Sequence, residues 1–220
     1  MGKEIEVKLA APDAAALESV FSDARIEQAR AGAWQELRMV TEYLDTPDRQ
    51  IAARKWMLRR RMENEKCVYT VKTPEICHIR GEWESQRETL EEAVREMVRL
   101  GAPEELAALV KGGVSRTCGV EFVRRTARLM LGEARGEACG EARPGPGAVR
   151  GEEQRTLCEV CLDDGVLLGT ARRRPFCEVE LELVSGPLEP MLELSGYLQE
   201  RYGLHEERRS KFVRAAELTD

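Results

Sequence analysis

Charged and aliphatic residues alternate in the first segment of the chain, and this alternation predicts a β-strand with one polar face. If side chains alternate with a period of two over Glu4–Leu9, one face carries three charged residues, Glu4, Glu6 and Lys8. Aliphatic residues occupy the other face. Taken alone, this pattern is typical of an ordinary half-buried strand. The same pattern recurs later in the chain, and this recurrence favours a functional role for the charged residues.

Further strand-like segments also carry their charges along one face. Residues 178–183 alternate three carboxylates with aliphatic side chains. A basic segment places Arg59 and Arg61 on one face, and the segment after it adds Lys72. Ordinary surface strands mix the two charge signs, whereas here one strand is acidic and another is basic. This separation of sign indicates that the charged faces bind something.

The rest of the pattern predicts short strands interrupted by a few helices. Alternation and apolar runs predict further strands at 34–45, 56–63, 67–73, 78–86, 118–131, 155–162 and 177–184. Helical spacing of apolar residues predicts helices at 12–24, 89–100, 103–111 and 188–202. Turns are predicted at 46–48, 64–66 and 163–165, and residues 210–214 form a short tail.

Composition limits the class of protein. The chain has 220 residues, enough for one domain with its own core, and we expect a single domain over residues 1–220. Residues 132–153 are rich in Gly, Pro, Glu and Arg without apolar periodicity, so we expect a mobile loop there. The net charge of −6 argues against nucleic-acid binding. No apolar run reaches the length of a membrane span, so we expect a cytoplasmic protein without a membrane partner.

The seven cysteines do not suggest a disulfide framework. Their number is odd, and several lie in apolar strand patterns where a free thiol packs as a small hydrophobic group. Cys158 and Cys161 have the spacing of half a zinc motif, but they would face opposite sides of a strand. Because the chain has only two histidines, we expect no zinc site.

Strands joined by hairpin turns predict an α+β fold whose antiparallel sheet closes, or nearly closes, into a barrel. Helices need apolar surface to pack on, so we expect them outside, on the aliphatic faces of the strands. The charged faces then line a polar lumen. Two like charges about 4 Å apart cost several kcal/mol at intermediate dielectric, so such a lumen requires counter-ions. A polyanion would neutralise the basic wall, and Mg²⁺ or Mn²⁺, which prefer oxygen ligands, would neutralise the acidic wall.

Eight short motifs occur in order along the chain. They are ExExK at Glu4–Lys8, YxxTPD at Tyr43–Asp48, LRxR at Leu58–Arg61, TxK at Thr70–Lys72, FxR at Phe122–Arg124, ExxLDxG at Glu159–Gly165, CExELELxSG at Cys177–Gly186 and SKxxR at Ser210–Arg214. In these motifs the chain resembles the CYTH superfamily of triphosphate tunnel metalloenzymes, and within it the bacterial inorganic triphosphatases. The resemblance covers essentially the whole chain. One small departure is Arg214-Ala215-Ala216, where the family often has RGY.

The resemblance implies an eight-stranded antiparallel tunnel that binds a linear triphosphate and one or two divalent metals. The metal ligands it implies are Glu4, Glu6, Glu180 and Glu182. The phosphate ligands it implies are Lys8, Arg59, Arg61, Lys72, Arg124 and Lys211. Glu4, Glu6 and Lys8 are the expected catalytic residues. Glu159 and Asp163 are expected to support the site or steer the substrate.

We therefore expect an enzyme that hydrolyses inorganic triphosphate to pyrophosphate and phosphate with Mg²⁺ or Mn²⁺. A class IV-like adenylyl cyclase, or a hydrolase of thiamine or nucleoside triphosphates, would keep the fold and change the substrate. A non-enzymatic polyphosphate-binding module would keep the cations and lose the glutamates. The expected partner is a small-molecule triphosphate, and the sequence leaves a monomer and a homodimer equally open.

Overall fold

The computed structural model describes residues 5–74, 81–132 and 155–219. The nine strands found there are β1 (Glu6–Ala11), β2 (Arg30–Asp45), β3 (Met57–Glu63), β4 (Lys66–Lys72), β5 (Glu82–Gln86), β6 (Ser115–Leu131), β7 (Thr156–Leu168), β8 (Arg173–Ser185) and β9 (His205–Glu206). The seven helices found there are α1 (Ala14–Phe21), α2 (Ala24–Ala29), α3 (Gln50–Ala53), α4 (Leu90–Arg99), α5 (Glu105–Lys111), α6 (Glu189–Tyr202) and α7 (Lys211–Ala216). Even the longest helix in these ranges, α6 with 14 residues, falls well short of a membrane span.

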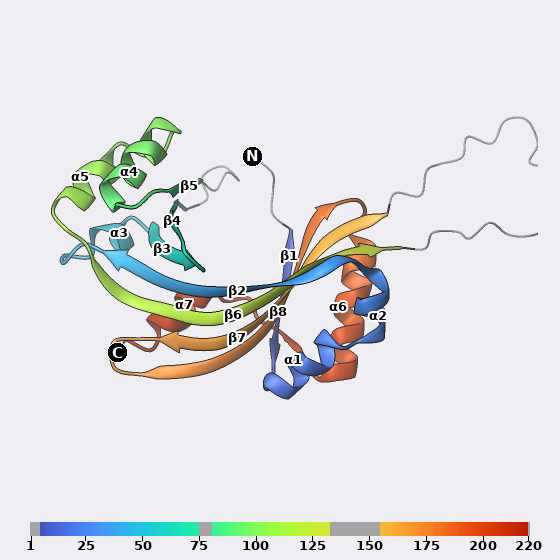
Figure 1. The fold of residues 1–220 in the computed structure, drawn as a ribbon. Helices are drawn as coiled ribbons and strands as arrows, with labels where there is room; N and C mark the ends of the chain where they lie inside the picture. Colours follow the sequence, from blue (N-terminus) through green and yellow to red (C-terminus); the bar gives the residue numbers. More distant parts are fainter. Residues whose placement is uncertain (1–4, 75–80, 133–154, 220) are drawn as a thin grey trace, which may run out of the picture. The chain divides into compact units, whose positions relative to one another are not determined.

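The strands form one hydrogen-bonded sheet in the order β5-β4-β3-β2-β6-β7-β8-β1-β9 (Figure 1). The pairs β1–β8, β1–β9, β2–β3, β3–β4 and β4–β5 are antiparallel. The predicted antiparallel α+β fold is thus confirmed. The sheet has nine strands rather than the eight expected, with β5 and β9 at the two ends of this order. Closure into a barrel stays a prediction, because no pairing between those end strands occurs among the described residues.

The described residues form two compact units, and the long strands β2, β6, β7 and β8 contribute segments to both. The first unit takes its residues from the ranges 1–35, 125–162 and 177–206. The second takes its residues from the ranges 36–124, 163–176 and 207–220. Each unit has its own hydrophobic core, so each is described separately.

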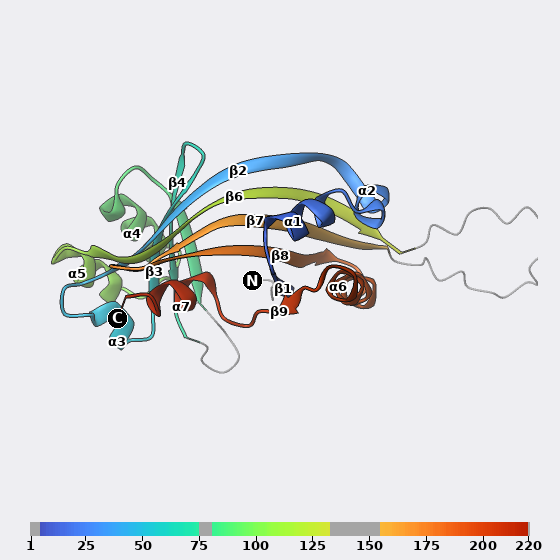
Figure 2. The same cartoon turned by 90° about the horizontal axis from the view of Figure 1, so that it is seen from below.

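In the first unit, helices cover the apolar face of β1 and β8 (Figure 2). Leu9 lies directly opposite Val179 in the antiparallel register, and both side chains are fully buried. Leu17 of α1 and Leu198 of α6 belong to the same core. Since alternate residues point to opposite faces, this packing leaves the charged residues of both strands on the uncovered side.

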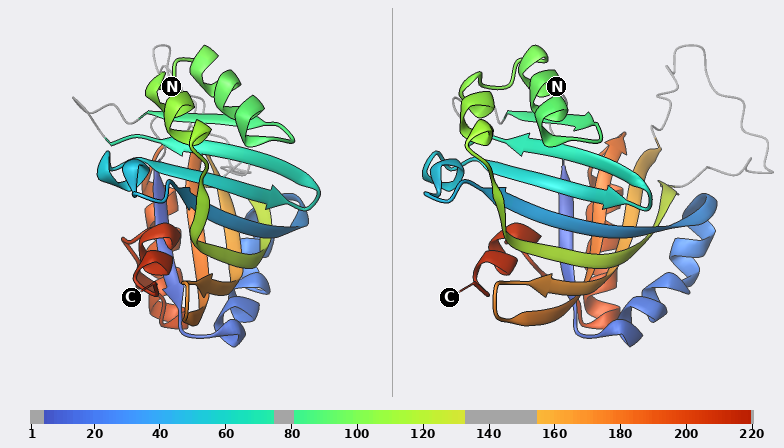
Figure 3. Two further views of the ribbon diagram at one scale, coloured as in Figure 1. Left: turned by 90° about the vertical axis from the view of Figure 1, so that its left-hand side faces the viewer. Right: turned by 60° about the vertical axis from the view of Figure 1, so that its left-hand side comes forward.

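In the second unit, α4 and α5 pack on the apolar face of β3, β4 and β5 (Figure 3). Leu58, Val71 and Trp83 lie opposite one another on these three strands. They contact a core that includes Met97 of α4 and Leu106 of α5. The opposite face of the same strands therefore carries the polar and charged residues.

The helix predicted over 12–24 is α1, and a second helix that was not predicted, α2, follows it. Helix α1 ends at Phe21, and α2 begins at Ala24. The break occurs because the Asp23 carboxylate accepts hydrogen bonds from the backbone N–H groups of Arg25 (2.8 Å) and Ile26 (3.2 Å), which starts a new helix. A short helix, α7, also replaces the predicted tail, and the Ser210 hydroxyl caps it.

The predicted turn at 163–165 is wrong. Strand β7 continues through these residues to Leu168, and the turn lies later, where the N–H of Gly169 donates to the carbonyl of Arg172 (2.9 Å). A Cβ atom at Gly165 would collide with the backbone carbonyl of Glu121 and the side chain of Phe122. The glycine therefore serves close packing between β7 and β6 rather than a turn.

Three sequence-based expectations lie outside the described residues. They are the position of Glu4, the first part of the strand predicted at 78–86, and the loop predicted at 132–153 apart from its first residue. The other predicted strands and helices have counterparts in the structure, with boundaries shifted by a few residues. The turn predicted at 46–48 is followed by the short helix α3.

We predict that Gly165→Ala lowers the free energy of unfolding by about 1–3 kcal/mol, because the added methyl group overpacks the contact with β6. Urea denaturation measures this change. The matched control is Gly196→Ala in α6, where no atom lies within 4 Å of the new methyl group. That variant is expected to be neutral or more stable by up to about 1 kcal/mol. Equal stabilities for the two variants would contradict the packing role of Gly165.

Candidate functional site

The first unit places four carboxylates on the charged face of β1 and β8, and we call these residues the acidic face. They are Glu6, Glu178, Glu180 and Glu182. The register sets Glu6 directly opposite Glu182 and Lys8 directly opposite Glu180. The Nζ atom of Lys8 lies 3.3 Å from an Oε of Glu6 and 3.9 Å from an Oε of Glu180. The structure thus brings together every predicted metal ligand that it describes.

Burial increases along the acidic face from one end to the other. The side chain of Glu6 is 47% exposed and that of Glu180 is 14% exposed, while Glu178 is fully buried. Like charges directly opposite each other on paired strands are destabilising, so the Glu6–Glu182 pair favours a bound cation. All four donors are carboxylates, which suit Mg²⁺ or Mn²⁺ better than softer metals. The chemistry of these donors therefore fits the predicted metal.

The second unit carries a basic face on the polar side of β2, β3, β4 and β5 and on adjoining segments. Its cations are Arg59, Arg61, Lys72, Arg124 and Lys211. These are all the predicted phosphate ligands except Lys8, which lies in the first unit. The basic face therefore gathers residues from four separate motifs of the sequence.

Arg59 belongs to a row of polar residues that crosses four neighbouring strands. Tyr43, Arg59, Thr70 and Glu84 lie opposite one another in the register. Arg59 donates from Nε to the Thr70 hydroxyl (3.1 Å) and from Nη2 to Glu84 (2.9 Å). The Thr70 hydroxyl also donates to Glu84 (2.8 Å). These bonds fix the plane of the Arg59 guanidinium.

The positive charge of Arg61 is much less neutralised by its neighbours than that of Arg59. Its Nε donates to the Thr41 hydroxyl at 3.3 Å, and the carboxylate paired with it, that of Glu63, is 3.7 Å away. Burial, together with the positive charges of Arg59 and Arg124, lowers the pKa of Arg61 from its ordinary value to about 10. A shift of this size corresponds to roughly 3 kcal/mol of unfavourable interaction for the charged form. An anion that contacts Arg61 would remove this penalty.

Asp163 connects two further cations of the basic face. Its carboxylate is fully buried and accepts two hydrogen bonds from Arg124, each 2.7 Å long. The ammonium of Lys211 lies 2.9 Å from the same carboxylate. Lys211 also lies 5.4 Å from the ring centre of Phe122 and 5.5 Å from that of Phe176, within the range of cation–π contacts. Two cations therefore share one buried carboxylate and are held against two aromatic rings.

Several residues of the basic face were assigned no role, or a lesser role, from the sequence. Asp163 was expected only to support the site, and the partners of Lys72 and Arg59 were not expected at all. Those partners are Glu82, which lies 2.7 Å from Lys72, and Glu84. The 64–66 turn fixes which residues of β3 and β4 face each other, but Glu82 and Glu84 lie on β5, whose place beside β4 the sequence pattern does not specify.

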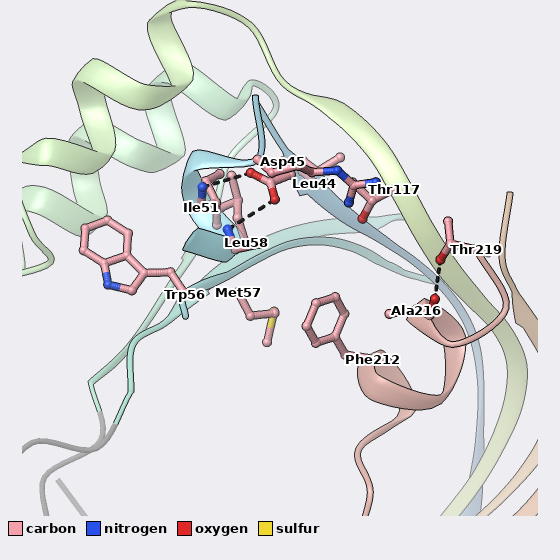
Figure 4. Close-up of a pocket in the computed structure, with 12 residues that line it drawn as sticks. Leu44, Asp45, Ile51, Trp56, Met57, Leu58, Thr117, Phe212, Ala216 and Thr219 are labelled. Carbon is pink, nitrogen blue, oxygen red and sulfur yellow. Dashed lines mark hydrogen bonds between the residues drawn. The ribbon is translucent and has the colours of Figure 1, made fainter. Parts of the chain in front are cut away.

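The second unit also contains a small, mostly apolar cavity of about 160 Å³ (Figure 4). Trp56, Met57 and Phe212 lie in its wall, together with the buried carboxylate of Asp45. That carboxylate accepts hydrogen bonds from the first backbone N–H groups of α3, including that of Ile51 (2.9 Å). Because Asp45 is used to cap a helix, its charge is already stabilised within the protein. Arg49 also lines the cavity, but none of the five cations of the basic face does.

A family model decides which family these features belong to. The model of the CYTH domain matches residues 2–216. The chain belongs to the CYTH family. The resemblance seen in the eight sequence motifs is thereby confirmed. A comparison with curated proteins found no match to the chain.

Solved structures of similar fold share little sequence with this CYTH chain. The proposed adenylyl cyclase HpAC1 from Hippeastrum, described as having a dominant triphosphatase activity, is 19% identical with a TM-score of 0.59, over 99% of this chain and 97% of that one. An adenylate cyclase candidate from Bacillus halodurans is 17% identical with a TM-score of 0.49, over 97% and 98%. The inorganic triphosphatase NE1496 is 18% identical with a TM-score of 0.38, over 100% and 99%. Because the sequence identity is this low, the similarity to HpAC1 supports only the assignment of the fold.

We predict opposite effects on stability for two substitutions on β3. Arg61→Gln is expected to raise the free energy of unfolding at pH 7 by up to about 2 kcal/mol, because it removes a half-buried and poorly neutralised charge. Arg59→Gln is expected to lower it by about 1 kcal/mol, because Thr70 and Glu84 lose their partner. Urea denaturation in a phosphate-free buffer measures both.

The pH dependence of the Arg61 effect follows from its pKa. As the pH rises above about 10, the unfolded chain still holds the proton that the folded chain has lost, so the folded state becomes relatively more stable. The difference between wild type and Arg61→Gln is therefore full at neutral pH and shrinks above pH 10. A loss of stability in Arg61→Gln equal to that in Arg59→Gln would contradict this account.

We predict that Mg²⁺ or Mn²⁺ raises the melting temperature of the wild-type protein and that Glu182→Gln reduces this rise. The reason is that the substitution removes one of two carboxylates that face each other on β1 and β8. Differential scanning fluorimetry with and without EDTA measures the effect. Glu193→Gln, an exposed substitution on α6, is the control and is expected to keep the full rise. The same rise in both variants would rule out Glu182 as a ligand.

Proposed function

We propose that this CYTH protein is a divalent-metal-dependent enzyme that hydrolyses inorganic triphosphate to pyrophosphate and phosphate. The observation that carries the proposal is the half-buried Arg61, which lies near the positive charges of Arg59 and Arg124 while its paired carboxylate, that of Glu63, is 3.7 Å away. A guanidinium with so little neutralisation of its charge favours the binding of a multiply charged anion. Linear triphosphate is such an anion, and the basic face supplies five cations to bind it.

The two kinds of cation suit different parts of this task. The guanidiniums of Arg59 and Arg124 are each held in a fixed plane by carboxylates, which prepares them to bind two phosphoryl oxygens at once. Lys72 and Lys211 act as point charges, each positioned by an acidic partner. Because these groups are already oriented, little ordering is required when the substrate binds.

The acidic face has the separate role of holding the metal. We assign Glu6, Glu180 and Glu182 as ligands, with Glu4 as a further predicted ligand from the sequence. A divalent metal bound there would lower the pKa of its water and offset charge on the phosphates. Lys8, 3.3 Å from Glu6, holds that carboxylate in place. The proposal includes the predicted closed tunnel, since one substrate has to meet both faces.

The reaction needs little covalent chemistry from the protein. A water oxygen attacks the terminal phosphorus, the bond to the bridging oxygen breaks, and pyrophosphate leaves. A carboxylate of the acidic face accepts the proton of the attacking water. The cations of the basic face stabilise the charge that develops on the leaving group. Placement of charge and of water is therefore the main contribution of the chain.

The adenylyl cyclase remains the second candidate, because HpAC1 bears that name although triphosphatase activity dominates in it. A cyclase also has to hold an adenine ring. The aromatic residues of the apolar cavity, Trp56 and Phe212, are the described residues best suited to contact such a ring or a thiamine. A non-enzymatic polyphosphate-binding module is disfavoured because it has no use for the glutamates of the acidic face.

We predict that tripolyphosphate with Mg²⁺ or Mn²⁺ is converted to equal amounts of pyrophosphate and phosphate, and far faster than ATP is converted to any product. The basic face matches a chain of three phosphates and leaves no cation to orient a nucleoside. Ion chromatography of the products measures both reactions. Glu6→Gln is expected to lose at least about 100-fold in kcat, since a metal ligand is removed.

Two results would overturn this proposal. Formation of cyclic AMP from ATP, with tripolyphosphate acting only as an inhibitor, would favour the cyclase. Near-full activity of Glu6→Gln at low metal concentration would remove the metal assignment. The fold of the variant is checked by circular dichroism, so that loss of activity is not confused with unfolding.

A further inference from the structure

We propose that the turn between β7 and β8 forms a second anion site, which binds a small molecule with two or more phosphate groups. The site is an open cavity of about 420 Å³ in the second unit. Its basic residues are Arg116 at the start of β6, and Arg172 and Arg173 at the turn. None of the residues that line it belongs to the basic face described above.

The turn that carries two of these arginines is held in place by three contacts. The N–H of Gly169 donates to the carbonyl of Arg172 (2.9 Å), which closes the turn. The Thr170 hydroxyl donates to the carbonyl of Thr219 (3.0 Å), which ties the turn to the segment after α7. Gly169 also packs so closely on Leu218 that a Cβ atom would not fit. The backbone at Arg172 and Arg173 is therefore positioned in advance.

The third arginine is placed by a glycine in β6. The Nη2 and Nε atoms of Arg116 lie 3.1 Å and 3.2 Å from the position that a Cβ atom would take at Gly119. The guanidinium thus lies close to the backbone of the strand, although Arg116 as a residue is exposed to solvent. A glycine inside a strand weakens the strand, and such a position often marks a close approach of another group. Here the nearest group is the backbone carbonyl of Thr41, 2.7 Å from the Cβ position, and the guanidinium of Arg116 is the next.

Charge on this cavity is poorly balanced. Among the residues that the structure describes, no carboxylate lies within ion-pair distance of the guanidinium of Arg116 or Arg173. The chain as a whole has a net charge of −6, so this cluster does not reflect a basic composition. Several guanidiniums around one cavity repel one another, and an anion that binds between them removes this repulsion.

The chemistry of the cluster favours a phosphate-bearing ligand. Guanidiniums bind phosphate groups through paired N–H donors, and three of them match an anion with several oxygens on more than one group. The volume admits a short phosphate chain but not a folded macromolecule. Pyrophosphate, the product expected from the proposed reaction, is the simplest molecule of this class and serves as the probe.

The test counts bound pyrophosphate by equilibrium dialysis of radiolabelled ligand against the full-length protein in EDTA at fixed ionic strength. The variant is Arg116→Gln/Arg173→Gln, which removes two charges from the cavity. The matched control is Arg38→Gln/Arg174→Gln, which removes two charges from exposed positions that do not line the cavity. Melting curves confirm that both variants are folded.

We expect the variant to bind one equivalent of pyrophosphate less than the wild type and the control to bind the same as the wild type. If both proposed sites exist, the wild type binds two equivalents and the variant binds one. If only the second anion site at the turn exists, the wild type binds one equivalent and the variant binds none. Failure of the proposed function therefore gives a different result from failure of the second site. The turn site is overturned if the variant keeps the wild-type number, or if the control loses an equivalent as well. Equal competition by citrate would overturn the choice of a phosphate-bearing ligand.

Discussion

The buried carboxylate of Asp163 is the interaction on which the basic face depends. It has no exposed surface, and it accepts two hydrogen bonds from Arg124 while it pairs with Lys211. Breaking a buried pair of this kind costs roughly 3–5 kcal/mol, because an uncompensated charge remains inside the protein. The Asp163 carboxylate therefore holds the side chains of Arg124 and Lys211 in fixed positions on the basic face.

Strand register places the charged side chains of neighbouring strands on one face of the sheet. On β1 and β8, the same alternation that buries Leu9 against Val179 places Lys8 opposite Glu180. On β2 to β5, it aligns Tyr43, Arg59, Thr70 and Glu84 across four strands. A slip of one residue would exchange the apolar and charged faces of a strand. Core packing therefore fixes the positions of the charged groups as firmly as it fixes the fold.

Much of this arrangement could be predicted from the sequence, because alternation is a local signal. It identified the strands, their charged faces and most of the residues on the acidic and basic faces. The turn expected at Asp163-Asp164-Gly165 failed because local turn chemistry was overridden by the close packing of Gly165 on β6. Helix α2 was missed because the capping carboxylate of Asp23, at the end of the predicted helix, resembles any other polar residue.

Long-range partners were harder to predict for a different reason. Asp163 has Arg124 as a partner 39 positions away, and no periodicity links the two residues. The pairing of Lys72 with Glu82 depends on β5 lying next to β4, which hydrophobic patterning does not specify. Sequence patterns show which face a residue occupies, whereas the identity of its neighbour depends on the order of the strands.

The pairing of β1 with β8 has a consequence for how the protein is made. β1 is synthesised well before β8, because β2 to β7 lie between them in the sequence, yet the acidic face needs both. Until β8 has left the ribosome, Glu6 has no opposing carboxylate and Leu9 has no strand to pack against. A nascent chain therefore cannot assemble the acidic face before β8 has been made. Pairing between strands that are far apart in the sequence also slows folding, so we expect the acidic face to be among the last features to form.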